Sequence, residues 1–532
     1  MSTRLRNHLW FATSLIVAGA AWLAPTAAAE IQRPNVVIIL ADDLGYGDVQ
    51  CYNPQRGKIT TPNLDSLAAQ GIRFTDGHSS SGVCSPSRYT LLTGRYHWRT
   101  RLQSGIVGVF GEPLIAPDRL TIAGLAKRRG YRTACIGKWH LGWDWPIEPA
   151  QRKFLQGARP QGKDDEAPLA TAEHLAVWQD VFSKPIAGGP TTRGFDEYFC
   201  TDVPNWPPYC FIENNRTVGI PSELLPARLL RGNPPMASLP GPALKDWKLD
   251  AILPALGDRV CASIDRFAKN REPFLIYMPL TSPHEPLAVN APWKGESRLN
   301  VYADFVMETD AIVGRVLDAL GRCGAADNSI VIFTSDNGKA AYTGAAELEK
   351  LGHYPSGPLR GYKTSVYEGG HREPFIVRWP GVVKPGSVCG QLIHHADILA
   401  TLAEILGVKL PDHAGEDSFS FLPLLKGGDQ PIRQHAVSCA ANGVPGLRQG
   451  EWKLILAADA QAKTNVQLYN LADDIGETKN LAAEQPERVA DMKALLERLI
   501  TAGRSTPGTP QKNDVRVRRF PEQASPKGTA KP

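Results

Sequence analysis

The stretch Asn35-Val36-Val37-Ile38-Ile39-Leu40, which Ala41 separates from the pair Asp42-Asp43, decides the fold. An unbroken apolar run, in place of an alternation of apolar and polar residues, is typical of a strand buried on both faces, as in a parallel sheet between helices. Two carboxylates directly after such a strand stand where open α/β sheets place their ligands. On its own, the pair could equally be a solvated strand end.

Similar apolar runs recur along the chain, and we expect strands at Thr133–Ile136, Phe274–Pro279 and Ser329–Phe333. Helical patterns lie between them: one covers Leu64–Gln70 and another Thr121–Arg129, each followed by a glycine suited to a left-handed cap. Strands that alternate with helices predict an α/β fold, here a large domain with a mostly parallel mixed sheet between helices.

The N-terminus has the pattern of an export signal. Residues 1–29 combine a basic start, an apolar run and Ala27-Ala28-Ala29, which predicts a cleavable signal peptide and a periplasmic or secreted protein. A membrane anchor is the alternative, although the run is short for a span, so we expect no stable membrane span after cleavage. The 59 Lys and Arg residues against 54 Asp and Glu give a net charge of +5 without a basic block in the body of the chain, which disfavours a nucleic-acid partner.

The rest of the chain divides into three parts. Residues 30–425 carry the α/β pattern, and a Gly-Gly-Asp-Gln-Pro stretch then marks a boundary. Residues 426–502 contain short alternating segments and a helix from near Pro486, which predicts a small antiparallel sheet packed with a helix. Residues 503–532 are rich in Pro, Lys and Arg, and we expect a disordered tail.

A second pair of oxygen ligands follows another predicted strand. Asp336-Asn337-Gly338 comes after Ser329–Phe333 as Asp42-Asp43 comes after its own strand. Parallel strands that deliver oxygen ligands at their carboxyl ends can converge on one hard cation, Ca²⁺ or Mg²⁺, which would relieve the repulsion between the two aspartates.

Two segments combine residues suited to an anion. In Cys84-Ser85-Pro86-Ser87-Arg88, Pro86 suits the first position of a helix, so Cys84 would lie where unpaired backbone N–H groups favour an anion. A buried cysteine beside a surface arginine is the alternative. In the second segment, Lys138 and His140 are two residues apart, so an extended chain would place both on one face.

These segments carry a family resemblance. Cys84-x-Pro-Ser-Arg88 with Leu92-Thr93-Gly94-Arg95 resembles the sulfatase signature, in which the cysteine is converted to formylglycine, and the segment 130–142 resembles the second sulfatase signature. His284, in Thr-Ser-Pro-His-Glu-Pro, and Lys363, in Arg-Gly-Tyr-Lys, match the remaining sulfate-binding positions of the family. The resemblance runs from about Pro34 to Leu481, and the arylsulfatase A-like branch, with its alkaline phosphatase-like fold, fits best.

The resemblance implies a sulfuric ester hydrolase that acts on aryl sulfates in vitro and on a sulfated small molecule or saccharide in nature. It implies a Ca²⁺ ion, in preference to Mg²⁺, held by Asp42, Asp43, Asp336, Asn337 and the modified Cys84. Arg88 would hold the formylglycine diol, and His140 would be the base for its second hydroxyl. Lys138, His284 and Lys363 would bind sulfate, with His284 or Lys363 as proton donor. A formylglycine-generating enzyme would be a partner during maturation.

Several alternatives stay open. A phosphonate or phosphate ester hydrolase of the same superfamily is one, and a non-catalytic binder of sulfated glycans is another if Cys84 stays unmodified. The segment 143–268 has no family motif and would hold substrate selectivity; its aromatic residues near Trp206 could stack on a sugar or simply pack. Cys200 and Cys210, two of nine cysteines, could form a disulfide or remain buried thiols.

Overall fold

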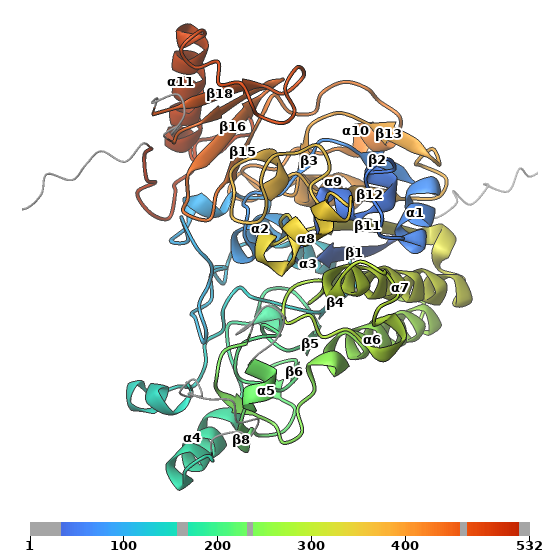
Figure 1. Cartoon of the computed structure of the whole chain (residues 1–532), viewed down its shortest axis with the longest axis vertical. Coiled ribbons are helices and arrows are strands. Elements are labelled where there is room, and N and C mark those ends of the chain that lie inside the picture. Colours follow the sequence, from blue (N-terminus) through green and yellow to red (C-terminus); the bar gives the residue numbers. More distant parts are fainter. Residues whose placement is uncertain (1–32, 157–168, 231–237, 458–464, 521–532) are drawn as a thin grey trace, which may run out of the picture. The chain divides into compact units, whose positions relative to one another are not determined.

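A ten-stranded mixed sheet organises the computed structural model, which describes residues 33–156, 169–230, 238–457 and 465–520 (Figure 1). The strands lie in the order β13 (Ser387–Cys389), β2 (Ile72–Phe74), β12 (Phe375–Arg378), β11 (Ser329–Ser335), β1 (Asn35–Ala41), β10 (Phe274–Pro279), β4 (Arg132–Ile136), β5 (Glu197–Cys200), β6 (Ile212–Glu213) and β7 (Arg216–Thr217). Two further pairs are β3 (Gly77–His78) with β14 (Ile393–His394), and β8 (Glu223–Leu224) with β9 (Pro242–Ala243).

The stretch that opens the sequence is the central strand. Val36 of β1 pairs with Leu275 of β10 on one side and with Ile330 of β11 on the other, and both pairings are parallel. All seven residues of β1 are buried, as the unbroken apolar run predicts. The four predicted strands are confirmed; β1, β4 and β11 extend one or two residues beyond the predicted bounds.

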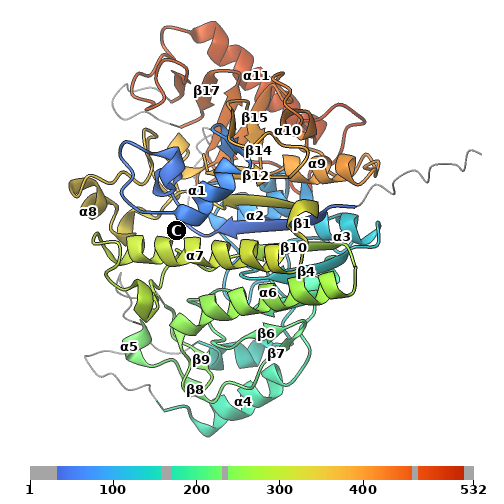
Figure 2. The ribbon, with the colours of Figure 1, turned by 90° about the vertical axis from the view of Figure 1, so that its right-hand side faces the viewer.

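Helices cover the sheet in two groups (Figure 2). On one face α1 (Pro62–Ala69) and α6 (Ile252–Lys269) pack against α7 (Val301–Arg322). On the other, α2 (Cys84–Thr93) and α3 (Ile122–Lys127) pack against α9 (Asp397–Ile405). Both predicted helices are confirmed within two residues, with Thr121 as the N-cap of α3. The other α-helices of the main domain, within the described residues, are α4 (Ala172–Phe182), α5 (Ala227–Leu230), α8 (Ala345–Lys350) and α10 (Leu422–Leu425).

A small antiparallel sheet follows, as predicted, with the order β15 (His435–Cys439), β16 (Pro445–Gln449), β17 (Trp452–Ile455) and β18 (Gln467–Asn470). The helix α11 (Pro486–Ala502) packs on it through Val489, Met492 and Leu496. The same apolar cluster includes Tyr96 and Trp98 of the main domain, so the small sheet and the main domain share a core.

The prediction of a disordered tail over residues 503–532 is wrong for residues 503–520. Val517 is buried in the core of the small sheet, and both Asp514 oxygens accept hydrogen bonds from Arg95, at 3.1 and 3.0 Å. Buried Arg95 needs acidic partners, which outweighs the polar composition of the segment. Residues 521–532 lie outside the described residues.

All nine cysteines are free thiols, so the disulfide considered for Cys200 and Cys210 is not formed. The predicted signal peptide, residues 1–29, lies outside the described residues. Within the described ranges, no helix is both long and apolar enough to cross a membrane.

Candidate active site

Four neighbouring parallel strands end at the same edge of the sheet, and each is followed by predicted site residues. In sheet order these are Asp336 and Asn337 after β11, Asp42 and Asp43 after β1, His284 after β10, and Lys138 and His140 after β4. The parallel register brings these seven side chains from four distant segments to one place.

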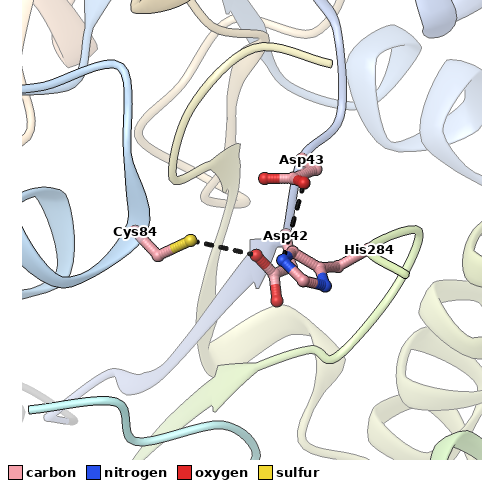
Figure 3. Close-up of side chains that lie close together, drawn as sticks. All are labelled: Asp42, Asp43, Cys84 and His284. Atoms are coloured by element: carbon pink, nitrogen blue, oxygen red, sulfur yellow. Dashed lines mark hydrogen bonds and ion pairs between the residues drawn. The ribbon is translucent and has the colours of Figure 1, made fainter. Parts of the chain in front are cut away.

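Cys84 reaches this edge from the start of α2. Its side chain points at Asp42 (Figure 3), with Sγ 3.8 Å from an Asp42 oxygen and 3.7 Å from Lys138 Nζ. The helix begins at Cys84 and not at Pro86, so the proline is its third residue; a proline costs no intrahelical hydrogen bond there either. Burial raises the pKa of the Cys84 thiol to about 12. An unmodified Cys84 is therefore a neutral thiol.

Arg88 and Lys138 surround Asp42 with positive charge. Lys138 Nζ donates to Asp42 Oδ2 at 2.7 Å, and Arg88 lies 3.4 Å from Oδ1. Arg88 also donates twice to Asp336, at 3.0 and 2.7 Å, and once to the Lys138 carbonyl, at 2.9 Å. Asp42, Arg88 and Lys138 are fully buried. Arg88 thus fixes a carboxylate and a backbone segment of the site together.

Asp43 makes a second set of contacts. It accepts hydrogen bonds from Asn337 Nδ2 at 2.7 Å and from Lys363 Nζ at 2.6 Å, and His284 Nε2 lies 3.7 Å from the same carboxylate (Figure 3). Asp43 has a positive φ of 64°, a backbone conformation that is uncommon for residues other than glycine. Lys363 arrives from the loop between α8 and β12, far from the others in the sequence.

The residues present fit a hard cation. The Asn337 amide nitrogen donates to Asp43 and to the Gly338 carbonyl, which orients the amide and directs Oδ1 elsewhere. Oδ1 is buried, and no hydrogen-bond donor among the described residues reaches it. Ligand atoms of Asp42, Asp43, Cys84 and His284 also lie within 4.8 Å of one another. Three carboxylates and a free amide oxygen form a donor set typical of Ca²⁺.

The carboxylates are crowded. Burial and the neighbouring Asp42 raise the pKa of Asp336 to about 6. Burial alone would raise the pKa of Asp42 too, but Lys138, His284 and Arg88 hold it well below its usual range. The pKa values of Asp42 and Asp336 are thus shifted in opposite directions, because two neighbouring carboxylates repel each other when both are charged. Additional positive charge at this site would be stabilising.

His140 differs from its prediction. Its φ is +53° and that of Gly137 is +143°, so the segment is not extended, and the argument that Lys138 and His140 share a face by alternation is wrong. The His140 N–H donates to Asp202, and its ring Nε2 donates to the Val107 carbonyl at 3.1 Å. Burial, and then Lys138, lower the pKa of His140 well below its usual value. It is a neutral imidazole whose buried Nδ1 has no hydrogen-bond partner in the described ranges.

His284 is also held in one tautomer. Its Nδ1 lies 2.6 Å from the Glu285 carbonyl, which can only accept, so Nδ1 carries the proton and Nε2 faces the site unprotonated. Burial, and then Lys138, lower the pKa of His284 to about 4. Burial opposes the charge on Lys363, but Asp43 outweighs it and raises the pKa of Lys363 well above its usual value.

Three supporting residues, Asp202, Tyr302 and Lys339, were not predicted from the sequence. Asp202 accepts the His140 N–H at 3.1 Å. Tyr302 donates to the Asp43 carbonyl at 3.0 Å, and its ring lies 3.1 Å from Lys339 Nζ. Asp202 follows the parallel strand β5 as the other site residues follow theirs, so strand position was an available signal for it. Tyr302 lies inside α7, and no local pattern marks it.

Comparisons with known proteins agree with this geometry. Residues 34–408 match the family model described as Sulfatase, and residues 362–504 match the model for the C-terminal part of N-sulphoglucosamine sulphohydrolase. The chain is 33% identical over 494 residues to an N-acetylgalactosamine-6-O-sulfatase of Bacteroides thetaiotaomicron, covering 88% of this chain and 94% of the relative. It is 31% identical over 514 residues to human arylsulfatase A, covering 91% and 90%.

A solved structure from work on glycosaminoglycan metabolism by Bacteroides thetaiotaomicron superposes with a TM-score of 0.73 at 31% identity. The match covers 88% of this chain and 99% of that one. The similarity therefore extends over the main sheet and the small C-terminal sheet together.

Proposed function

Because the chain belongs to the sulfatase family of sulfuric ester hydrolases, we propose that it removes sulfate from a sulfated carbohydrate with a formylglycine made from Cys84 and one calcium ion. The observation that supports this most directly is the position of Cys84. Its sulfur lies at the start of a helix, 3.7 Å from a lysine and 3.8 Å from a carboxylate that fits a cation site.

The formylglycine and the calcium ion would each make a distinct contribution to the reaction. A hydrated formylglycine carries two hydroxyls, so one can attack sulfur while the other later expels sulfate, which a serine or an unmodified cysteine cannot do. A calcium ion held by Asp42, Asp43, Asp336 and Asn337 would favour the ionised form of an attacking hydroxyl and neutralise sulfate charge.

The lysines supply the remaining positive charge. Lys138 and Lys363 are paired with Asp42 and Asp43, at 2.7 and 2.6 Å, and these are the carboxylates that a cation would engage. Carboxylates that bind a cation hold an ammonium group less strongly, which leaves both lysines able to bind sulfate oxygens. Arg88 donates hydrogen bonds to Asp336 and to the Lys138 carbonyl, so it holds Asp336 and the Lys138 segment in fixed positions. It lies one turn of α2 after the residue to be modified, Cys84.

Proton transfer is divided between two residues. We assign the proton for the leaving oxygen to Lys363, because the proton of His284 is committed to the Glu285 carbonyl and leaves Nε2 as an acceptor. His140, a neutral imidazole with a free Nδ1, is the candidate base for the second hydroxyl. His284 Nε2 then contributes by accepting a hydrogen bond or orienting Lys363.

The first experiment compares wild type with Cys84→Ala, both produced with a formylglycine-generating enzyme. We expect wild type to release sulfate from 4-nitrocatechol sulfate and from at least one member of a panel of sulfated sugars. Cys84→Ala should lose at least about 10⁴-fold in kcat with an unchanged circular dichroism spectrum. Mass spectrometry of the Cys84 peptide must show the aldehyde; an intact thiol in active enzyme would overturn the formylglycine assignment.

The alternatives give other results in the same assay. Faster turnover of the phosphate ester of the same alcohol would indicate a phosphoryl hydrolase. Tight binding of sulfated sugars without turnover, in protein from its producing cell whose Cys84 remains a thiol, would indicate a glycan-binding protein.

Export is a separate proposal that rests on residues 1–29. A periplasmic or secreted enzyme should be recovered with Glu30 as its first residue. N-terminal sequencing of protein purified from its producing cell tests this; an intact Met1 in that protein would contradict it.

A further inference from the structure

An exposed aromatic residue is tied to the segment that carries His284. Tyr342 lies in the short helix Ala341–Thr343 after Asp336 and Asn337, and 55% of its side chain is exposed. Its hydroxyl donates to Glu285 Oε1 at 3.2 Å. A single exposed aromatic ring is not a site by itself, so its position relative to the active site has to carry the argument.

The location of this pair supplies the second observation. Glu285 follows His284 directly, and its carbonyl accepts the His284 Nδ1 proton at 2.6 Å. Partial burial raises the pKa of both Glu285 and Tyr342, and Lys363 and Asp43 act electrostatically on both. The Glu285–Tyr342 pair therefore borders the side of the site that holds His284 and Lys363, where the leaving oxygen of the ester is expected.

An open groove continues from the same segment. Pro286, Leu287, Ala288 and Val289 line a cavity of about 480 Å³ together with residues 246–250 of the segment 143–268. A leaving group larger than one ring thus has room beyond Glu285. Pro286, the residue after Glu285, lines this groove, so the groove adjoins the segment that carries His284 and Glu285.

Building on the proposed sulfatase function, we propose that Glu285 and Tyr342 form the subsite for the sugar that carries the sulfate. The Glu285 carboxylate accepts hydrogen bonds from ring hydroxyls, and the Tyr342 ring packs against the C–H face of the sugar. A carboxylate at this position selects a neutral, hydroxylated ring and repels an acidic one. The substrate class is then the sulfate ester of a neutral sugar or amino sugar, with its next residue in the groove.

Glu285 also supports His284, but this structural role is separate from the proposed recognition of sugar hydroxyls. Its contact with His284 is made by the backbone carbonyl, and that contact does not depend on the side chain. Removing the carboxylate charge should therefore leave the sulfate-binding residues in place and change only the recognition of hydroxyls.

The test compares two substrates across matched variants: 4-nitrocatechol sulfate, which has no sugar hydroxyls, and the sugar sulfate that wild type hydrolyses fastest. We expect Glu285→Gln and Tyr342→Ala each to lower kcat/KM for the sugar sulfate about ten-fold and for the aryl sulfate less than about three-fold. Tyr342→Phe, which keeps the ring, should fall between wild type and Tyr342→Ala. The control is Glu213→Gln, a carboxylate on β6 paired with Arg259, which should change neither substrate.

Each outcome bears on a different proposal. Equal losses on both substrates, or no loss on the sugar sulfate, would overturn the subsite, as would a wild type that hydrolyses aryl sulfates and no sugar sulfate. A wild type carrying formylglycine that hydrolyses neither substrate would instead overturn the proposed function.

Discussion

Two buried clusters of charge in this chain have the same formal composition and different behaviour. The catalytic cluster contains three carboxylates and three cations, Asp42, Asp43, Asp336, Arg88, Lys138 and Lys363. The buttress cluster also contains three of each, Asp76, Glu368, Glu477, Arg372, Arg448 and Lys453, together with His78 and His371.

In the buttress cluster each acid lies within ion-pair distance of at least one cation. Lys453 lies 2.8 Å from both Glu368 and Glu477, and Arg448 lies 3.2 Å from Asp76. Although burial opposes ionisation, Lys453 and its neighbours hold the pKa of Glu368 well below its usual range. Burial raises the pKa of one acid in each cluster, Glu477 in the buttress cluster and Asp336 in the catalytic cluster. The clusters differ in geometry: Lys453 already lies between Glu368 and Glu477, whereas the buried Oδ1 of Asn337 beside the catalytic carboxylates meets no donor among the described residues and fits an added cation.

The same difference argues against a second metal site. Ligand atoms of His78, Glu368 and His371 lie close enough together to hold an ion. Lys453 Nζ already lies 2.8 Å from Glu368 and 3.3 Å from His371 Nε2. The chain therefore supplies its own cation there, and this cluster joins the small sheet to the segment that leads to Lys363.

The largest expected effect on stability comes from Lys453→Met. It leaves Glu368 and Glu477 buried without their shared cation, and we expect the free energy of unfolding to fall by about 3–5 kcal/mol in urea denaturation. Lys479→Met is the control: Lys479 is 68% exposed and pairs with Glu484 at 3.4 Å, so its loss should cost less than about 0.5 kcal/mol. Similar losses in both variants would contradict the structural role of the buttress cluster.

Lys138→Met makes the same substitution in the catalytic cluster, at a lysine that is equally buried. Here we expect kcat/KM for an aryl sulfate to fall about 10²–10³-fold, because Lys138 no longer meets sulfate charge. With calcium present, the loss of stability should be smaller than in Lys453→Met, since the ion can neutralise Asp42. Equal destabilisation of the two variants in calcium would remove the distinction between the clusters.

Removing the metal should affect only one cluster. A bound ion stabilises the folded state by about 2.7 kcal/mol at 100 times its Kd, so chelation should lower the Tm of the purified protein. Asp336→Asn should abolish the calcium-dependent shift in Tm. Glu368→Gln should lower the Tm and keep the shift; its disappearance in Glu368→Gln would show that the ion binds elsewhere.

The two clusters also differ in how far the sequence predicts them. Asp42, Asp43, Asp336 and Asn337 follow apolar strands, so their convergence follows from parallel strand order alone. The expected helix start and the residue spacing marked Cys84 and Lys138 as candidates, and the family resemblance implied their roles. Neither predicted the backbone turn at His140, whose φ is +53°. The turn at His140 depends on contacts with Asp202 and Val107, which are distant in the sequence, so local sequence patterns do not predict it.

The buttress cluster could not be predicted in this way. Asp76, Glu368, Lys453 and Glu477 are far apart in the sequence and share no periodicity, and each would be expected at the surface from its residue type. The pairing of Arg95 with Asp514, 419 residues later, was missed for the same reason, and a composition typical of disorder suggested the opposite. Long-range ion pairs become visible only when the fold has brought both partners together.

Acid should weaken the buttress cluster through its histidines, the smallest effect of the four. Burial, and then Lys453, lower the pKa of His371 well below 6.5, and His78 and Glu368 face the same ring. The folded state therefore binds fewer protons than the unfolded state below pH 6.5, so this contribution to stability is present above that pH and is lost as the pH falls. One such group contributes a slope of at most about 1.4 kcal/mol per pH unit.

We expect His371→Gln to reduce the slope of the unfolding free energy, measured in urea between pH 5 and 6.5, by up to that amount. An unchanged slope would mean that His371 is protonated in the folded protein and that the buttress cluster carries an uncompensated charge.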